Sequence, residues 1–227
     1  MKFLIVQTGA APAPVRRRYG DYPQWFRRGL AIAAAQIECV RVDRGGNLPS
    51  PRTLAAALVT GSDAMVSERR AWSERTAAWL RDAVDADLPL LGVCYGHQLL
   101  AHALGGRVHY NPRGEEIGTI EVRRLAAARA DMLFGALPAR FPAQATHEQT
   151  ILRPPRGAAV LAASEQDDHQ AVRFAPRAWG VQFHPEFGVR EMRAFLAGEQ
   201  QADKRRCVRA CREARGILRR FAQLFMR

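Results

Sequence analysis

Short apolar runs that end at glycine or cysteine alternate with amphipathic segments through the first hundred residues. The runs at 2–9, 37–42, 54–61 and 87–94 are mostly apolar, which is typical of strands buried on both faces of a sheet. Between them, 21–35 and 67–86 carry apolar residues at helical spacing among arginines, which predicts two helices, the second with Ser67 as its N-cap. Strands that alternate with helices predict an α/β protein with a three-layer, open, mostly parallel sheet.

The second half of the chain has a different pattern. Short alternating runs at 107–110, 117–122, 159–164, 169–175 and 178–183 are separated by turns rich in glycine, proline and aspartate. This pattern predicts an antiparallel extension of the sheet. From residue 189 onward the spacing becomes helical, with helices expected at 189–197 and 208–225. The apolar face of the last helix is expected to cover the domain or a second copy of the chain; it comprises Val208, Ile217, Leu218, Phe221 and Leu224.

Composition favours a single domain that is neither secreted nor embedded in a membrane. The chain has 227 residues, 48% of them hydrophobic, which is enough to bury one sizeable core. No apolar stretch approaches the roughly 18 residues of a membrane span, and the N-terminal run is shorter than a signal peptide requires. Four cysteines are too few and too unevenly spaced for a disulfide framework or a zinc site. We therefore expect a cytoplasmic protein without metal, cofactor or membrane partner.

The net charge of +12 is concentrated toward the end of the chain. Residues 199–227 carry nine Lys/Arg against three Asp/Glu, so half of the excess lies in this segment. No helix-turn-helix, zinc or aromatic-basic RNA pattern accompanies the charge. We interpret the charge as a solvated basic surface and expect no nucleic-acid partner.

The segment Gly92-Val93-Cys94-Tyr95-Gly96 contains the candidate nucleophile. It has the spacing of a nucleophile elbow, a sharp turn from a strand into a helix that holds the middle side chain clear of the backbone. A small buried core cysteine is the alternative for this pentapeptide taken alone. In the elbow interpretation, Cys94 attacks the substrate.

A second segment, "WGVQFHPEFG", offers the base that a cysteine nucleophile needs. His184 and Glu186 stand two residues apart at the end of an apolar run, where both side chains would point to one face of an extended chain. Pro185 between them donates no N–H, which indicates the end or the edge of a strand. His184 is thus the candidate general base, and Glu186 is the group that orients it.

The tetrahedral intermediate of such chemistry needs N–H donors for its oxyanion. In elbow-type hydrolases the residue after the nucleophile, here Tyr95, provides one backbone N–H. A glycine loop after another strand provides the second, and Gly61-Ser62 ends the preceding apolar run. A simple turn at the end of a strand is the alternative for that loop.

Together these residues resemble the class I (triad) glutamine amidotransferases, and most of all freestanding proteins similar to the glutaminase domain of GMP synthase. The resemblance rests on Gly92 to Gln98 and on Val181 to Glu186 and spans roughly residues 2–196. It implies a flavodoxin-like fold over 1–198, followed by a basic helical C-terminal extension at 199–227. It also implies release of ammonia from glutamine through a γ-glutamyl thioester on Cys94.

The same resemblance assigns roles to further residues. Cys94, His184 and Glu186 would form the catalytic triad, Gly61 and Tyr95 the oxyanion hole, and Gln98 a glutamine-binding residue. Ser62 and His147 are further candidates for substrate contacts. For His147, a surface histidine without a role in the site is an equally good interpretation. The loop Gly61-Ser62-Asp63 departs from the family's two successive glycines before a proline, and no ATP-pyrophosphatase module accompanies the domain.

Other functions compete with this one. A self-sufficient hydrolase of γ-glutamyl peptides would use the same residues, without the separate ammonia-accepting synthetase that a glutaminase chain needs. A non-catalytic interaction protein of the same fold would not need Cys94, His184 and Glu186 together. A PfpI/DJ-1-like protein would carry histidine directly after the cysteine, where this chain has Tyr95. A homodimer is left open as a further partner.

Overall fold

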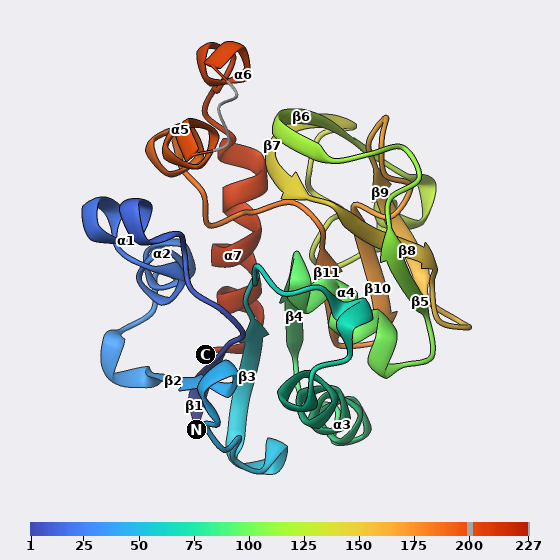
Figure 1. The fold of residues 1–227 in the computed structure, drawn as a ribbon. Coiled ribbons are helices and arrows are strands. Elements are labelled where there is room, and N and C mark those ends of the chain that lie inside the picture. Colours follow the sequence, from blue (N-terminus) through green and yellow to red (C-terminus); the bar gives the residue numbers. More distant parts are fainter. Residues whose placement is uncertain (199–201, 227) are drawn as a thin grey trace.

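A nine-stranded sheet forms the centre of the protein in a computed structural model that describes residues 1–198 and 202–226 (Figure 1). The strand order is β2-β1-β3-β4-β11-β10-β9-β6-β7, and a separate two-stranded sheet pairs β5 with β8. The strand bounds are β1 Lys2–Gln7, β2 Ile37–Arg41, β3 Leu54–Val59, β4 Leu90–Val93, β5 Arg107–Tyr110, β6 Glu116–Arg124, β7 Arg140–His147, β8 Gln149–Arg153, β9 Ala159–Ala163, β10 Ala171–Ala175 and β11 Ala178–Val181. Strands β2, β1, β3, β4 and β11 are parallel, and the remaining strands continue the sheet in antiparallel pairs. This arrangement confirms the predicted α/β sheet with an antiparallel extension.

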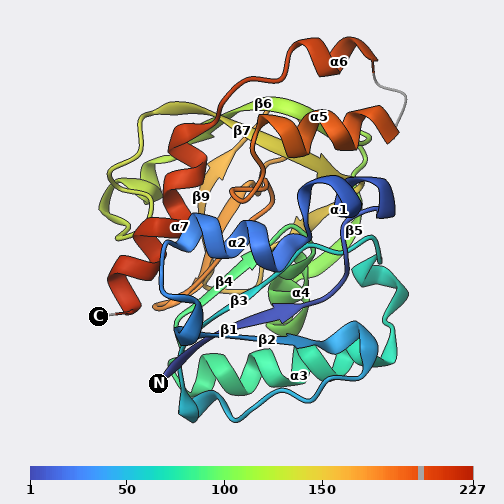
Figure 2. The same cartoon turned by 90° about the vertical axis from the view of Figure 1, so that its left-hand side faces the viewer.

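Helices cover both faces of the parallel part. Helices α1, α2, α5 and α7 lie over one face, which Figure 2 turns toward the viewer, and α3 and α4 lie on the other. The helix bounds are α1 Ala13–Tyr19, α2 Tyr22–Leu30, α3 Ala71–Asp85, α4 Tyr95–Ala103, α5 Val189–Gly198, α6 Ala202–Arg206 and α7 Arg212–Phe225. Within the described part of the chain, no helix is long and apolar enough to cross a membrane.

Two hydrophobic clusters, one on each face, hold these layers together. Along β1, Phe3 and Ile5 belong to the cluster under α2 and α7, whereas Leu4 and Val6 belong to the cluster under α3 and α4. All four side chains are fully buried, because successive side chains of a strand point to opposite faces and both faces are covered. This burial explains why the strand sequences are nearly continuous apolar runs.

Several boundaries differ from those predicted. The helix expected at 21–35 ends at Leu30, because Ala31 adopts a left-handed conformation with φ of 55°. The helix expected from Ser67 begins at Ala71 with Arg70 as its N-cap, and Ser67 lies in a short 3₁₀ turn, so the Ser67 cap was wrong. Strands β7 and β8 were not predicted, because residues 140–153 mix proline, threonine and glutamine with the apolar positions.

The last helix, α7, covers the sheet of its own chain. The helix expected at 208–225 begins at Arg212, so Val208 precedes the helix. Val208 and the α7 residues Ile217, Leu218 and Phe221 are buried in the same cluster as β1, while Leu224 is 36% exposed. This apolar face is therefore used within the chain and is not free for a second copy, and the homodimer stays a prediction. The predicted domain boundary after residue 198 falls at 199–201, outside the described residues, and also stays a prediction.

Replacement of Phe221 by alanine is expected to lower the free energy of unfolding by about 3–5 kcal/mol, the usual cost of truncating a buried aromatic side chain. The Phe221 ring is fully buried and meets the rings of Phe3 and Trp179 edge-on, with centroids 6.2 and 6.4 Å away. Urea denaturation would measure the change. Leu224→Ala on the same helix is the matched control, and an equal loss in that variant would contradict the expectation.

Candidate active site

Cys94 lies at the turn between β4 and α4, where the backbone is strained. Its φ of 50° and ψ of −104° are rare for a residue with a side chain, and such strain persists only where the surroundings hold it. A side chain at Gly92 would collide with the Gly96 carbonyl, and one at Gly96 would collide with the Val59 carbonyl. The two glycines therefore permit the close approach that the turn requires, and the spacing identified in the sequence has a steric cause.

His184 and Glu186 follow the end of β11, the parallel neighbour of β4. Val181 pairs with Val93 in the sheet, so both carboxyl ends open at the same edge. The His184 Nδ1 atom lies 2.8 Å from a carboxylate oxygen of Glu186, and this geometry makes Nδ1 the donor. The Phe187 ring stacks on the imidazole, with centroids 4.2 Å apart. Because both side chains are almost fully buried, the surrounding residues hold the imidazole in this orientation.

The second nitrogen of His184, Nε2, is buried and has no hydrogen-bond partner among the residues that the structure describes. Burial by itself would lower the pKa of His184, but the nearby Glu186 carboxylate, followed by the Cys94 side chain, outweighs it and raises that pKa to about 10. The imidazole is consequently protonated at neutral pH. A protonated imidazole can give a proton to a leaving group, and this role of His184 stays a prediction.

Gly61 lies between these two side chains. A Cβ atom built on Gly61 would be 3.2 Å from the His184 Cε1 atom and 3.8 Å from the Cys94 Cβ atom, so the three residues share one small space. The hydroxyls of Thr8 and Thr60 both donate to the Gly61 carbonyl at 2.9 Å and hold the loop. Tyr95 is the first residue of α4, and its N–H therefore has no carbonyl partner within the helix. The oxyanion role of Gly61 and Tyr95 stays a prediction that this placement supports.

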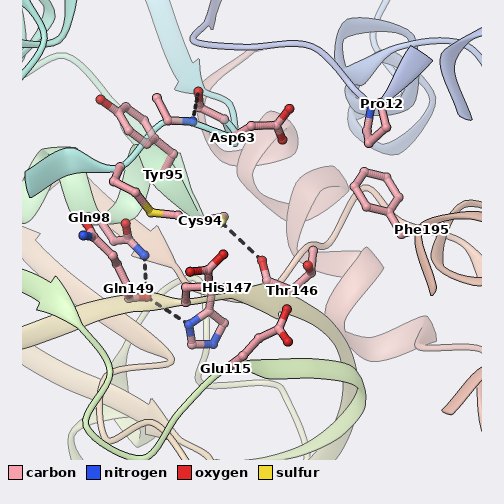
Figure 3. Close-up of a pocket in the computed structure, with 14 residues that line it drawn as sticks. Pro12, Asp63, Cys94, Tyr95, Gln98, Glu115, Thr146, His147, Gln149 and Phe195 are labelled. Atoms are coloured by element: carbon pink, nitrogen blue, oxygen red, sulfur yellow. Dashed lines mark hydrogen bonds between the residues drawn. The ribbon is translucent and has the colours of Figure 1, made fainter. Parts of the chain in front are cut away.

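A pocket of about 290 Å³ opens over Cys94 (Figure 3). The residues that line it are Pro12, Ser62, Asp63, Ala64, Met65, Cys94, Tyr95, Gln98, Glu115, Thr146, His147, Glu148, Gln149 and Phe195. Three of them, Asp63, Glu115 and Glu148, are exposed carboxylates, whereas no lysine or arginine is among the described residues of the lining. The mouth of the pocket is thus acidic on a chain whose net charge is +12.

The three residues predicted to contact substrate all line this pocket, but each already has protein partners. Gln98 donates through its amide nitrogen to the Gln149 carbonyl at 2.7 Å and to the Gln182 side chain at 2.9 Å. The Ser62 hydroxyl donates to the Thr8 carbonyl at 2.9 Å. These bonds shape the walls of the pocket, and the substrate contacts of Gln98 and Ser62 stay predictions.

His147 is buried, not at the surface, and both of its ring nitrogens are engaged. Nδ1 lies 3.0 Å from the Gln149 carbonyl, and Nε2 lies 3.0 Å from a carboxylate oxygen of Glu116. The ring therefore holds the chain beside Thr146, whose carbonyl lies 3.8 Å from the Cys94 sulfur. The sequence did not indicate Glu116 or Thr146, because β6 and β7 come close to Cys94 only in the folded chain.

Comparison with known proteins gives the family. A family model described as "Glutamine amidotransferase class-I" matches residues 25–199. The chain belongs to this family. Over 159 residues it is 44% identical to a GMP synthase (glutamine-hydrolyzing) of Aeropyrum pernix, covering 70% of this chain and 29% of that protein. It is also 36% identical over 110 residues to one of the subunits of a GMP synthase (glutamine-hydrolyzing) of Methanocaldococcus jannaschii, covering 46% of this chain and 54% of the relative.

Solved structures agree on the fold of this class I amidotransferase. A glutamine amidotransferase of Thermotoga maritima matches with a TM-score of 0.75 at 20% identity, over 99% of this chain and 97% of the other. A protein of Thermoplasma acidophilum, described as one of the subunits of a GMP synthase, matches with a TM-score of 0.69 at 19% identity, over 100% and 94% of the two chains. The chain spans less than two thirds of the two curated relatives named above, and their whole activity does not transfer by similarity alone.

Replacement of Gly61 by alanine is expected to lower kcat for glutamine hydrolysis by about 10- to 100-fold, because the added methyl group would push on the His184 ring and displace it. Steady-state kinetics would measure this loss, and urea denaturation would verify that folding is intact. Gly216→Ala on α7, where a methyl group meets only open space, is the matched control. Unchanged kcat in Gly61→Ala would show that the His184 ring does not need its present position.

Proposed function

We propose that this protein hydrolyses the γ-amide of glutamine and releases ammonia through a γ-glutamyl thioester on Cys94. The observation that carries the proposal is that a strained elbow cysteine and a histidine bound to a buried carboxylate both lie against Gly61. A nucleophile, a base and a group that orients the base are the parts that covalent acyl transfer requires. Membership of the class I amidotransferase family supports the choice of glutamine.

In the proposed reaction, the Cys94 thiolate attacks the γ-carbonyl carbon, and the N–H groups of Gly61 and Tyr95 face the oxygen that becomes negative. Protonated His184 gives its proton to the amide nitrogen, ammonia leaves, and the γ-glutamyl group remains on the sulfur. A water molecule then attacks the thioester while His184 takes up its proton. Glutamate leaves, and the Cys94 thiolate and protonated His184 are restored. Glu186 keeps Nδ1 protonated throughout and stabilises the imidazolium.

The ammonia is proposed to pass to a separate synthetase. The relative from Methanocaldococcus jannaschii is named as one lettered subunit of a GMP synthase, a name that implies at least one more polypeptide. The relative from Aeropyrum pernix is more than three times as long as the matched region, since that region is 29% of it. In this proposal, a second polypeptide provides the synthetase activity, whereas the longer relative would carry both activities in one chain.

A second candidate, hydrolysis of a γ-glutamyl compound without a partner, is favoured by one feature. The acidic rim of Asp63, Glu115 and Glu148 would attract the ammonium group of a substrate and repel carboxylates. Within this second candidate, γ-glutamyl amides of neutral or cationic amines fit better than acidic γ-glutamyl peptides such as glutathione conjugates.

A substrate panel on the purified chain tests the proposal. Glutamine, a γ-glutamyl dipeptide, a γ-glutamyl diamine and a glutathione conjugate would be compared by release of glutamate and of ammonia or amine. We expect glutamine to be hydrolysed, and a glutamine-analogue electrophile to label Cys94. Turnover of a γ-glutamyl compound without turnover of glutamine would replace the first candidate by the second. Inertness toward all substrates, with Cys94 unlabelled, would identify a non-catalytic interaction protein of the same fold.

A further inference from the structure

A second cavity of about 520 Å³ is lined by residues of α1, α2, α5 and α7 and by Gly188. The residues that line it are Arg18, Tyr19, Arg28, Gly188, Val189, Arg190, Glu191 and Arg215. It shares no described lining residue with the pocket over Cys94. Figures 1 and 2 show the four helices gathered on the same face of the sheet. The volume is within the range of roughly 300–1,000 Å³ that is usual for small-molecule sites.

Four guanidinium groups surround this cavity, and one carboxylate opposes them. Glu191 is the only acidic residue among the described residues of the lining. It is paired with Arg28 at 3.1 Å and accepts a hydrogen bond from the Gly188 N–H, also at 3.1 Å. No carboxylate lies within ion-pair distance of Arg190 or Arg215 in the described part of the chain. Among its described lining residues, the cavity thus has three more positive than negative side chains.

The arginines of the lining differ in what they contact. The Arg215 guanidinium reaches Gly188, since a Cβ atom there would be 2.7 Å from its Nη1 atom. Arg18 lies over the ring of Tyr19, with its central carbon 5.3 Å from the ring centre. Arg190 is exposed in the first turn of α5, a ten-residue helix whose positive end faces the same space. Guanidinium groups from four helices, α1, α2, α5 and α7, line this cavity together with the N-terminus of α5.

We propose that this cavity binds the phosphate groups of a phosphorylated small molecule. Guanidinium groups match the geometry of phosphate oxygens and bind them through two parallel hydrogen bonds. Three positive charges in excess of Glu191 fit a diphosphate better than a single phosphate. A cavity of about 520 Å³ also has room for the group that carries the phosphates. The site begins two residues after Glu186, and its ligand would therefore contact the segment that holds the catalytic pair.

Isothermal titration calorimetry with inorganic pyrophosphate tests this site without reference to glutaminase activity. We expect the wild-type chain to bind pyrophosphate, and Arg190→Ala/Arg215→Ala to bind it about tenfold or more weakly, since each substitution removes a charge-assisted hydrogen bond. The matched control is Arg75→Ala/Arg156→Ala, which removes the same charge from two exposed positions outside the cavity. Labelling of Cys94 by an electrophile would verify that each variant retains its fold.

The remaining outcomes would overturn the proposal. Equal affinity in wild type and in Arg190→Ala/Arg215→Ala, or the same loss in the control variant, would mean that pyrophosphate senses only the overall charge. Citrate that binds as tightly as pyrophosphate would remove the assignment to phosphate. Binding of a hexaglutamate peptide in preference to pyrophosphate would identify the surface as a docking site for an acidic protein.

Discussion

Cys94→Ala and His184→Ala are each expected to lower kcat for glutamine hydrolysis by about three orders of magnitude or more. The double variant should be no worse than either single variant. The reason is that the nucleophile and its base act as one unit, so that removal of either removes the function of both. Cys94→Ser should also be nearly inactive, because an alcohol is a far weaker nucleophile than a thiolate at neutral pH. Release of glutamate under saturating glutamine would measure all four variants.

Cys207→Ala is the control for these variants, because Cys207 is an exposed free cysteine on the same chain. It should keep wild-type activity and wild-type labelling by the electrophile. Losses in Cys94→Ala and His184→Ala that multiply in the double variant would indicate two independent contributions. Full activity in Cys94→Ser would contradict the thioester.

Glu186→Gln is expected to move the alkaline limb of the pH–rate profile to lower pH by about 1–3 units, the usual effect of an opposite charge on a neighbouring pKa. In the wild type the pKa of His184 is raised to about 10, so the proton that it gives to ammonia is lost only above that pH. Without the Glu186 charge that pKa falls, and activity declines earlier. The profile of kcat between pH 6 and 11 would measure the shift, alongside a loss of kcat smaller than that of Cys94→Ala.

Glu186→Gln is also expected to change how the free energy of unfolding depends on pH. Because the folded-state pKa of His184 lies above the unfolded value of about 6.5, the stabilisation is complete below pH 6.5 and is lost as pH rises through about 10. Wild type should therefore lose more stability over this window than Glu186→Gln. Glu148→Gln, an exposed carboxylate at the pocket mouth, is the control. If the free energy of unfolding depends on pH in Glu186→Gln as it does in wild type, Glu186 does not raise the pKa of His184.

The sequence alone predicted the features that depend on local pattern. The run from Leu90 to Val93 is apolar throughout, and it forms a strand because both faces of the parallel sheet are covered by helices. Gly92 and Gly96 around Cys94 predicted the elbow, and the structure contains it because any side chain at either glycine would strike a carbonyl. Apolar periodicity and glycine spacing are short-range signals, so they can be identified without knowledge of the fold.

Tertiary structure decided what depends on contacts between distant segments. His147 is buried because Glu116, 31 residues earlier, accepts its hydrogen bond across the β6–β7 pair. Ser67, expected to begin a helix, lies instead in a 3₁₀ turn, where its hydroxyl accepts a hydrogen bond from the side chain of Gln149, 82 residues away. The arginines of the second cavity come from four helices, and in the sequence their charges indicated only an ordinary solvated surface. Contacts between residues so far apart in the sequence follow no periodic pattern. They depend on the path of the chain across the sheet and not on the helical or strand repeat within one element.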